Sequence, residues 1–380
     1  MHIHFIGIGG IGMSALARYY FAQSHTVTGS DLKPSEITEK LEKLGLKIMI
    51  GPHRAANVPK GAKRVIHTAA VFSSNPELQA AKRRRIKRLT YAEAVGELTR
   101  QHKTITVSGS HGKSTTTALS ALVLAEGCYN PTVIIGTKLK EFGNSNFRQG
   151  RGPYLVLEAD EYNRSFLNYR PHIAIVTNID AEHLDTYGNA EEVEKTFAKY
   201  LEKVPSDGYL ILNHDDLRLR KLGEKLNSPN IHWYSLEDRE SDVLRTILRI
   251  PGEHNLSNAL AALKLGRILG IHEPVILKVL SQYDGAWRRF EFKGILNGAF
   301  LYSDYAHHPT EIKATIAAAR SRFPLRRVWC VYEPHQYERL AYLWEEFTRA
   351  FHLADVVCIL PVYEVAGRER PDTAKEVNSE

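Results

Sequence analysis

The sequence predicts an α/β protein of two or three domains. Short apolar strands alternate with Ala/Leu-rich helical segments along most of the chain, an order that favours parallel sheets covered by helices. Two glycine turns, one starting near residue 7 and one near residue 109, each join a strand to a helix. The length of 380 residues also exceeds what one ordinary hydrophobic core contains.

The composition is that of a globular protein. Hydrophobic residues make up 43% of the chain and charged residues 24%, which excludes a disordered protein. No apolar run reaches the roughly 18 residues of a membrane span, and the N-terminus has no signal-peptide pattern. We therefore expect a cytoplasmic protein without a membrane partner, present as a monomer or weak homodimer.

The charge pattern and the cysteines restrict the partners further. A net charge of +7 suits an anionic substrate, and the run KRRRIKR at residues 82–88 raises nucleic acid as an alternative. We interpret this run as a helix end and a short strand on a solvated face, so no nucleic-acid partner is expected. Cys128, Cys330 and Cys358 lie far apart in apolar segments, which predicts buried reduced thiols rather than a disulfide or metal site.

The first glycine turn follows a strand at residues 2–7 and precedes a helical pattern at residues 13–22. It matches G-x-G-x-x-G, and a second strand then ends at Asp31, 24 residues after Gly7. This is the layout of a nucleotide-binding βαβ unit, and by itself it suggests a dinucleotide dehydrogenase. The unit is expected to span residues 1–100. Its candidate binding residues are Gly7, Gly9, Gly10, Ile11, Gly12 and Asp31.

The second glycine turn lies in TITVSGSHGKSTTTA at residues 104–118, between a β-branched strand and a helix. Backbone N–H groups at such a turn can bind phosphate, Lys113 adds a positive charge, and Ser114 offers a hydroxyl to magnesium. The spacing is shorter than in G-x-x-x-x-G-K-[ST], because Val107 stands where the first glycine would be. An ordinary strand-to-helix turn is the alternative. The candidate phosphate-binding residues are Gly109, Ser110, His111, Gly112, Lys113, Ser114 and Thr115.

Two acidic clusters follow later strands of this second unit, which we place at residues 103–289. Glu158 to Glu161 follow one strand, and residues 177–185 follow the next. The carboxyl ends of parallel strands share one edge of a sheet, so both clusters should lie beside the phosphate loop. Carboxylates next to a triphosphate indicate Mg²⁺ between them, whereas solvated loop carboxylates are the alternative.

Two further segments carry polar side chains. Asn255 and Asn258 open an Ala/Leu-rich helix, where they could bind an adenine edge or cap the helix. A third unit, at residues 293–380, contains the adjacent His307 and His308. Neighbouring histidines can form a metal pair, but adjacent side chains usually point in different directions, so no zinc site is expected.

Together the motifs resemble those of the Mur ligase family, and within it the members that join L-alanine to UDP-N-acetylmuramate. The resemblance covers nearly the whole chain, in family order: GIGGIGMSALA, SGSHGKSTTT, EADE, TNIDAEHLDTY, GEHNLSNALAA, RRFE, DYAHHPTEI and EPHQYER. It implies a Rossmann-like domain for the UDP-sugar, a central P-loop ATPase-like domain for ATP and Mg²⁺, and a C-terminal Rossmann-like domain for the amino acid. The dehydrogenase interpretation of the first turn is thereby replaced.

The resemblance also assigns roles to single residues. Lys113 would hold the β- and γ-phosphates, Ser114 and Glu158 a magnesium ion, and His183 a second one. Lys113, Glu158 and His183 form the implied catalytic set. Further nucleotide contacts are implied for Asn255, Asn258, Arg289 and Asp304, and amino-acid contacts for Tyr305, His307, His335 and Arg339.

The implied activity is ATP-dependent amide formation through an acyl phosphate, a step of peptidoglycan precursor synthesis. Two alternatives remain. Gln336 stands where the family commonly has arginine, which leaves open a related ligase that takes a preformed peptide. The chain also ends at Glu380, earlier than the family's third domain usually does, so we expect uncovered apolar strands there. This ending leaves open a nucleotide- or UDP-sugar-binding protein that does not ligate.

Overall fold

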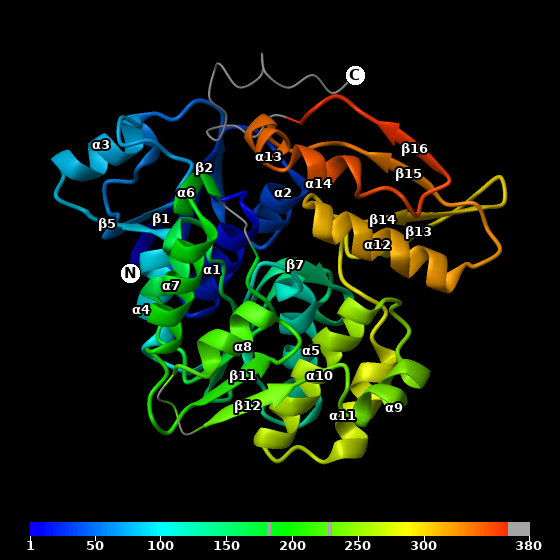
Figure 1. The fold of residues 1–380 in the computed structure, drawn as a ribbon. Helices are drawn as coiled ribbons and strands as arrows, with labels where there is room; N and C mark the ends of the chain where they lie inside the picture. The colour runs from blue at the N-terminus through cyan, green and yellow to red at the C-terminus, as the bar shows by residue number, and fades with distance from the viewer. Residues whose placement is uncertain (181–183, 227, 229, 364–380) are drawn as a thin grey trace.

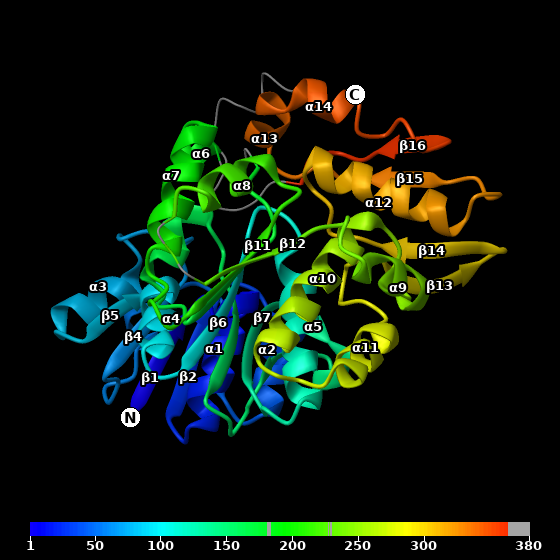
Figure 2. The same ribbon diagram turned by 60° about the horizontal axis from the view of Figure 1, so that its bottom comes forward.

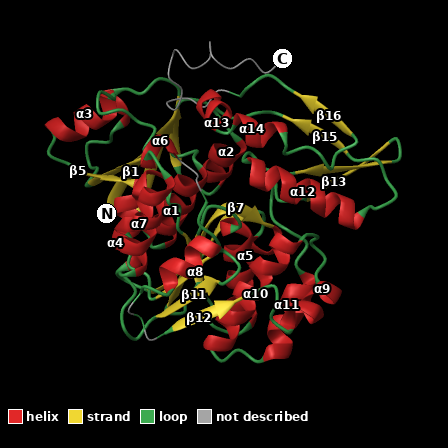
Figure 3. Cartoon of the chain, in the orientation of Figure 1, coloured by secondary structure: helices red, strands yellow, loops and turns green. Residues whose placement is uncertain are grey.

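The computed structural model describes residues 1–180, 184–226, 228 and 230–363. Its elements form three groups along the chain, named here the N-terminal domain (β1 to α4), the central domain (β6 to α11) and the C-terminal domain (β13 to β16) (Figure 1). Figure 3 shows that strands and helices alternate in all three. The expected α/β class is therefore confirmed. No helix among the described residues is long and apolar enough to cross a bilayer.

The N-terminal domain is a five-stranded parallel sheet in the order β3-β2-β1-β4-β5. Its first strand is almost entirely buried and delivers the chain into the glycine turn. Capping boxes at Ser35 and Thr90 fix the starts of α2 and α4. The elements are β1 (His2–Ile6), α1 (Ile11–Ala22), β2 (Thr26–Asp31), α2 (Glu36–Lys43), β3 (Lys47–Ile50), η1 (Ala55–Asn57), β4 (Arg64–His67), α3 (Pro76–Arg83), β5 (Lys87–Thr90) and α4 (Tyr91–Thr99).

The central domain is a seven-stranded sheet in the order β12-β11-β10-β6-β9-β7-β8, in which only β8 is paired antiparallel. The elements are β6 (Lys103–Ser108), α5 (Lys113–Glu126), β7 (Thr132–Leu139), η2 (Lys140–Phe142), β8 (Ser145–Arg148), β9 (Tyr154–Glu158), η3 (Tyr162–Asn168), β10 (Ile173–Val176), α6 (Leu184–Tyr187), α7 (Ala190–Leu201), β11 (Tyr209–Asn213), α8 (Leu217–Gly223), β12 (Ile231–Tyr234), α9 (Glu240–Ile247), α10 (Glu253–Ile268) and α11 (Glu273–Gln282).

Alternating side chains of the central strands point into two different cores. Ile105 and Val156 pack with α5, α10 and α11 on one face of the sheet. Leu155 and Leu157 pack on the other face with Phe197 of α7 and with α1 and α4 of the N-terminal domain. The N-terminal domain therefore covers part of the central sheet (Figure 2), and Asn146 adds a hydrogen bond to Ser14 of α1 at 2.9 Å.

The described part of the C-terminal domain contains an antiparallel hairpin, three helices and a parallel strand pair. Trp329 and Val331 are exposed on one face of the strand pair, and Val357 and Ile359 are exposed on the other. The elements are β13 (Glu291–Leu296), β14 (Ala299–Ser303), α12 (Pro309–Arg322), β15 (Trp329–Tyr332), α13 (Tyr337–Tyr342), α14 (Trp344–Thr348) and β16 (Val356–Ile359).

The cysteine prediction was partly wrong. All three thiols are free, but Cys128 and Cys358 are exposed and only Cys330 is partly buried. Cys128 follows the end of α5 in a left-handed backbone conformation that turns the chain outward, and Cys358 lies on the exposed strand β16. The basic run at residues 82–88 does end α3 and begin β5, with its charged side chains exposed, as predicted.

Candidate functional site

The phosphate loop connects β6 to α5 and depends on two glycines. Gly109 and Gly112 have φ values of +127° and +81°, in the region that favours glycine. A Cβ atom on Gly109 would lie 2.2 Å from Thr177 Oγ1, and one on Gly112 would lie 2.4 Å from Asn258 Oδ1. The loop therefore packs too closely against the segment after β10 and against α10 for any larger residue at either position.

Lys113, the first residue of α5, turns back over this loop. Its ammonium donates to the carbonyl oxygens of Gly109 at 2.7 Å and Ser110 at 3.1 Å, and to both carboxylate oxygens of Glu161 at 3.0 Å. The Glu161 side chain is only 1% exposed. A buried carboxylate thus holds the cation in place at the mouth of the loop.

Ser114 and Glu158 form the pair that the sequence predicted for magnesium. Ser114 Oγ donates to Glu158 Oε1 at 3.0 Å, and the backbone N–H of Gly136 donates to Oε2 at 2.8 Å. A hydroxyl and an oriented carboxylate are the hard oxygen ligands that Mg²⁺ prefers, so these residues fit the ion. His183, which is expected to bind a second magnesium ion, lies outside the described residues.

β6, β9 and β10 are parallel, so the phosphate loop, Glu158 and the segment after Val176 meet at one sheet edge, as predicted. Tyr91 connects this edge to the first glycine turn. A Cβ on Gly12 would lie 2.8 Å from the Tyr91 ring, and burial, Glu158 and Asp160 raise the pKa of the Tyr91 hydroxyl. The two glycine turns therefore face a common space.

The first glycine turn is braced by the end of β2. The N–H groups of Gly7 and Ile8 donate to the Ser30 carbonyl, and the N–H of Gly9 donates to Asp31 Oδ2 at 2.7 Å. Asp31 thus contacts the turn itself, while Gly10, Ile11 and Gly12 line the cleft described below.

Ser30 also reaches a carboxylate in the core of the N-terminal domain. Glu77 is fully buried and accepts from Ser30 Oγ at 2.8 Å and from Asn57 Nδ2 at 2.8 Å. His4 Nε2 lies 2.9 Å and His53 Nδ1 2.8 Å from its oxygens. The carboxylate of Glu77 is therefore the centre of the buried polar network beneath the first glycine turn.

The residues expected at the nucleotide base gather in a cavity of about 510 Å³ between α10 and the C-terminal domain. Asn258 accepts from Thr116 Oγ1 at 3.0 Å, and Asn255 donates to the Pro251 carbonyl at 2.7 Å. Asp304 accepts from the N–H groups of Phe290 and Ala306 at 2.7 and 2.8 Å. The structure thus brings together Asn255, Asn258, Arg289 and Asp304, together with Gly112 and Thr115 of the phosphate loop.

A larger cleft of about 810 Å³ lies among the three domains. It is lined by Gly10 to Gly12 of the first turn, by Lys113, Ser114 and Glu158, and by Tyr305, His307 and Arg339 of the C-terminal domain. His335 stands beside this group, with its ring centre 5.9 Å from that of Tyr305 and 5.0 Å from that of Tyr363. Burial lowers the pKa of His335.

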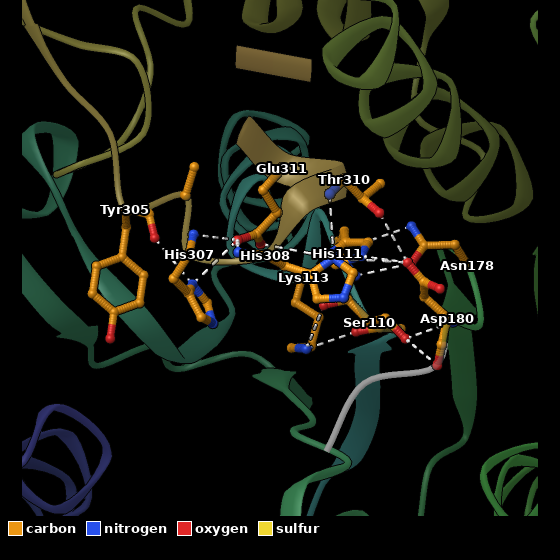
Figure 4. Close-up of polar contacts among 12 residues, drawn as sticks. Ser110, His111, Lys113, Asn178, Asp180, Tyr305, His307, His308, Thr310 and Glu311 are labelled. Atoms are coloured by element: carbon orange, nitrogen blue, oxygen red, sulfur yellow. Dashed lines mark hydrogen bonds and ion pairs between the residues drawn. The ribbon is translucent and has the colours of Figure 1, made fainter. Parts of the chain in front are cut away.

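A row of ionisable side chains joins the central and C-terminal domains between the 510 Å³ cavity and this cleft (Figure 4). His111 Nε2 lies 3.0 Å from Asp180 Oδ2, and His111 Nδ1 lies 3.4 Å from Glu311 Oε1. On the opposite side of Glu311, its Oε2 lies 3.1 Å from His307 Nδ1. Thr310 Oγ1 donates to Asp180 at 3.1 Å, which adds a second link.

The adjacent histidines point to different partners, as expected. His307 faces Glu311, whereas the His308 ring lies 4.9 Å from that of His111, and His308 Nδ1 accepts from the N–H of Thr310. His308 thereby caps α12.

Sequence reasoning did not assign roles to Glu161, Glu311 or Asp180. Each lies inside a motif that had been noted, in EADE, DYAHHPTEI and TNIDAEHLDTY. Glu161 lies three residues after the end of β9, and Glu311 lies three residues after the N-cap of α12. These positions were the signals in the sequence that could have identified the two residues. Their partners could not be read because those partners come from distant segments.

The structure therefore has the features of a phosphate-binding α/β protein whose three domains meet at one cleft. Three family descriptions match successive parts of it: Mur ligase family, catalytic domain (residues 2–103), Mur ligase middle domain (107–266) and Mur ligase, glutamate ligase domain (288–379). The chain belongs to the Mur ligase family.

Curated relatives agree with this assignment. The UDP-N-acetylmuramate–L-alanine ligase of Acetivibrio thermocellus is 40% identical, over 100% of this chain and 85% of the relative. The protein of the same name from Clostridium kluyveri is 40% identical over 95% of this chain and 83% of its own length.

Solved structures give the same picture. The UDP-N-acetylmuramate-alanine ligase of Thermotoga maritima superposes with a TM-score of 0.81 at 30% identity, covering 100% of this chain and 89% of that one. A murein peptide ligase of Psychrobacter arcticus has a TM-score of 0.72 over 95% of this chain and 91% of that chain, but at 23% identity it supports the fold alone.

Proposed function

We propose that this protein is an ATP-dependent ligase that joins L-alanine to the lactyl carboxylate of UDP-N-acetylmuramate in peptidoglycan precursor synthesis. The observation that carries the proposal is the 810 Å³ cleft, in which the first glycine turn, the phosphate loop and Tyr305, His307 and Arg339 line one space. A reaction that brings a nucleotide-sugar, ATP and an amino acid together needs such a meeting point of three domains.

We assign each of the three substrates to one part of the cleft and the neighbouring cavity, according to the residues that line that part. In the first turn, the start of α1 at Gly10, Ile11 and Gly12 is suited to the diphosphate of the UDP-sugar, while Gly7, Gly9 and Asp31 fix the shape of the turn. The phosphate loop and the neighbouring 510 Å³ cavity, with Asn255, Asn258, Arg289 and Asp304, are suited to ATP. Tyr305, His307, His335 and Arg339 form the amino-acid side.

The reaction begins with attack of the lactyl carboxylate on the γ-phosphorus of ATP. Lys113 offsets the charge on the transferred phosphoryl group, and the N–H groups at the start of α5 hold its oxygens. The products of this step are ADP and an acyl phosphate. Attack of the alanine amine on that anhydride then releases phosphate and leaves an amide.

Ser114 and Glu158 would hold one Mg²⁺, and His183 would hold a second. The ions would supply additional positive charge beside the phosphates. The buried Glu161 keeps Lys113 at the loop, and Gly136 orients Glu158, so the first step has pre-positioned groups. Contacts such as Thr310 with Asp180 hold the C-terminal domain over the loop, which favours exclusion of water from the acyl phosphate.

The proposal is tested by measuring ADP and phosphate release from the purified chain with ATP, Mg²⁺ and UDP-N-acetylmuramate. Alanine-dependent release, together with a product heavier by one alanyl group, is expected. Release with the tripeptide L-alanyl-γ-D-glutamyl-meso-diaminopimelate but not with alanine would instead identify the peptide-adding ligase. ATP and UDP-sugar binding by thermal shift without ADP formation would identify a non-ligating protein.

A further inference from the structure

Arg288 lies where the chain passes from the central domain to the C-terminal domain, three residues before β13. Its backbone has a φ value of +58°, in a region that few residues other than glycine adopt. Two hydrogen bonds hold this conformation. The N–H of Arg288 donates to Glu291 Oε2 at 2.9 Å, and its carbonyl accepts from the N–H of Tyr305 at 2.8 Å. A strained backbone that is held in this way is common at ligand-binding sites.

The guanidinium of Arg288 lies over two aromatic rings. Its central carbon is 4.6 Å from the ring centre of Tyr305 and 5.6 Å from that of Trp287. Stacking uses the flat faces of a guanidinium and leaves the N–H groups at its edge available for hydrogen bonds. No other described residue forms a hydrogen bond or an ion pair with this guanidinium. Arg288 is therefore oriented by its neighbours without using its donors.

The position of Arg288 distinguishes it from the next residue in the chain. Arg288 lines the 810 Å³ cleft but not the 510 Å³ cavity assigned to ATP, whereas Arg289 lines both. In Figure 4, Tyr305 lies at one end of the row of ionisable side chains, and Asp180, which lines the ATP cavity, lies at the other. Because Arg288 stacks on Tyr305, its guanidinium is on the side of the cleft assigned to the amino acid.

Positive charge gathers on this side of the cleft. Arg288 and Arg339 both line it. Burial lowers the pKa of His335, and the positive charges of His307, Arg339 and Arg288 lower it further. The charges of both arginines therefore reach the same part of the C-terminal domain, and such a concentration of positive charge favours an anionic ligand.

We propose that Arg288 binds the α-carboxylate of the incoming amino acid. The inference rests on the proposed function, because it names a residue that recognises the third substrate of that reaction. A carboxylate accepts two parallel hydrogen bonds from the fork of a guanidinium. The γ-phosphate and the lactyl carboxylate are the other anions that react, and they meet at the phosphate loop, where Lys113 supplies the positive charge.

This contact would also determine which amine is ligated. The α-carboxylate and the α-amine are attached to one carbon, so binding the carboxylate at Arg288 limits the positions that the amine can take. In a peptide the carboxylate of the first residue has become an uncharged amide. Arg288 therefore selects a free amino acid against the N-terminus of a peptide.

L-alaninamide tests the contact, because it has the shape of L-alanine but carries an uncharged amide in place of the carboxylate. KM for alanine is measured with ATP, Mg²⁺ and UDP-N-acetylmuramate, and the inhibition constant of alaninamide is measured in the same reaction. Wild type should bind alanine at least about tenfold more tightly than alaninamide. Arg288→Met should raise KM for alanine at least about tenfold and leave the constant for alaninamide within about threefold. KM for ATP and for UDP-N-acetylmuramate should also stay within about threefold.

Two further variants complete the experiment. Arg288→Lys keeps the positive charge but not the planar fork, so KM for alanine should rise at least about threefold without a change for alaninamide. This variant decides the question if Arg288→Met does not fold. Arg327→Met removes an exposed arginine of the same domain that lies 5.8 Å from the ring centre of Trp329 and lines neither space. It should leave every constant unchanged.

Three outcomes would overturn the inference while the proposed function stands. They are equal binding of alanine and alaninamide by wild type, a preference for alanine that the Arg288 variants retain, and a rise in KM for ATP or UDP-N-acetylmuramate as large as that for alanine. The third outcome would assign Arg288 to the γ-phosphate or the lactyl carboxylate. If the wild-type chain forms no alanyl product from alanine, the proposed function itself fails.

Discussion

Lys113 is paired with Glu161: its ammonium nitrogen lies 3.0 Å from both carboxylate oxygens, and the carboxylate is almost fully buried. Lys113→Ala removes the only lysine of the phosphate loop and leaves Glu161 without this cation. We expect ADP release to fall by at least about 100-fold, the effect of losing one pre-positioned electrostatic group. Lys140→Ala, at an exposed position in η2, is the matched control. Normal turnover by Lys113→Ala would exclude the assigned ATP site.

Gly112→Ala should impair ATP binding through a steric clash. The new Cβ would lie 2.4 Å from Asn258 Oδ1, in a backbone conformation with φ of +81°. Gly143→Ala has a similar φ of +70° but no atom within 4 Å of its Cβ, so it isolates the backbone strain. We expect about 1 kcal/mol of destabilisation for Gly143→Ala with KM for ATP unchanged. Gly112→Ala should in addition raise KM for ATP at least about tenfold, and equal KM values for the two variants would contradict this.

Glu77→Ala should destabilise the protein strongly. It leaves His4, Asn57, His53 and Ser30 without their common acceptor in the buried network, so a loss of about 3–5 kcal/mol in the free energy of unfolding is expected. Urea unfolding measures this loss. Glu42→Gln, at an exposed position in α2, should change the free energy by less than about 0.5 kcal/mol.

The polar network around Glu77 also predicts how the free energy of unfolding depends on pH. Burial opposes the ionisation of Glu77, but its hydrogen bonds with His4, Asn57, His53 and Ser30 lower the pKa to about 2 from the ordinary 4.5. Because the folded-state pKa is the lower one, the stabilisation is complete above pH 4.5 and is lost as the pH falls toward 2. The stability difference between wild type and Glu77→Ala should therefore shrink across this window. A difference that does not change with pH would show that folding leaves the pKa of Glu77 unshifted.

Asp31→Ala should weaken UDP-sugar binding selectively. Asp31 holds the N–H of Gly9 at 2.7 Å, a charge-assisted hydrogen bond of about 1.5–3 kcal/mol, and its loss would release the first glycine turn. We expect KM for UDP-N-acetylmuramate to rise about tenfold or more while KM for ATP stays the same. Steady-state kinetics with each substrate varied in turn would measure both, and parallel increases would indicate a general loss of structure instead.

Local patterns predicted the main elements of the fold and much of the site. A strand, a glycine pair and a helix are enough to define each turn, and parallel strands necessarily bring Glu158 and the segment after Val176 to one edge. The pairing of Ser114 with Glu158 follows from that edge. The roles of these residues in ATP and magnesium binding stay predictions for the experiments above.

Other features depend on how the domains pack and could not be read from the sequence. The contact of His111 with Glu311 joins residues 200 positions apart, and no local pattern specifies that distance. Cys358 is likewise exposed because both faces of β16 are exposed from Val357 to Ile359, whereas its apolar neighbours suggested burial. The buried position of Glu77 depends on four partners in separate elements, and its sequence context resembles an ordinary helix start.

The 200-residue separation between His111 and Glu311 also means that the ribosome makes the phosphate loop well before it makes α12. At translation rates of about 5–20 residues per second, roughly 10–40 s pass between the emergence of the phosphate loop and that of α12. In the last part of this interval, after Tyr234 has emerged, a nascent chain contains every β-strand of the first two sheets but has no C-terminal side to its cleft. A ribosome-bound chain therefore forms the phosphate loop before Asp304 and Glu311 complete the 510 Å³ cavity beside it.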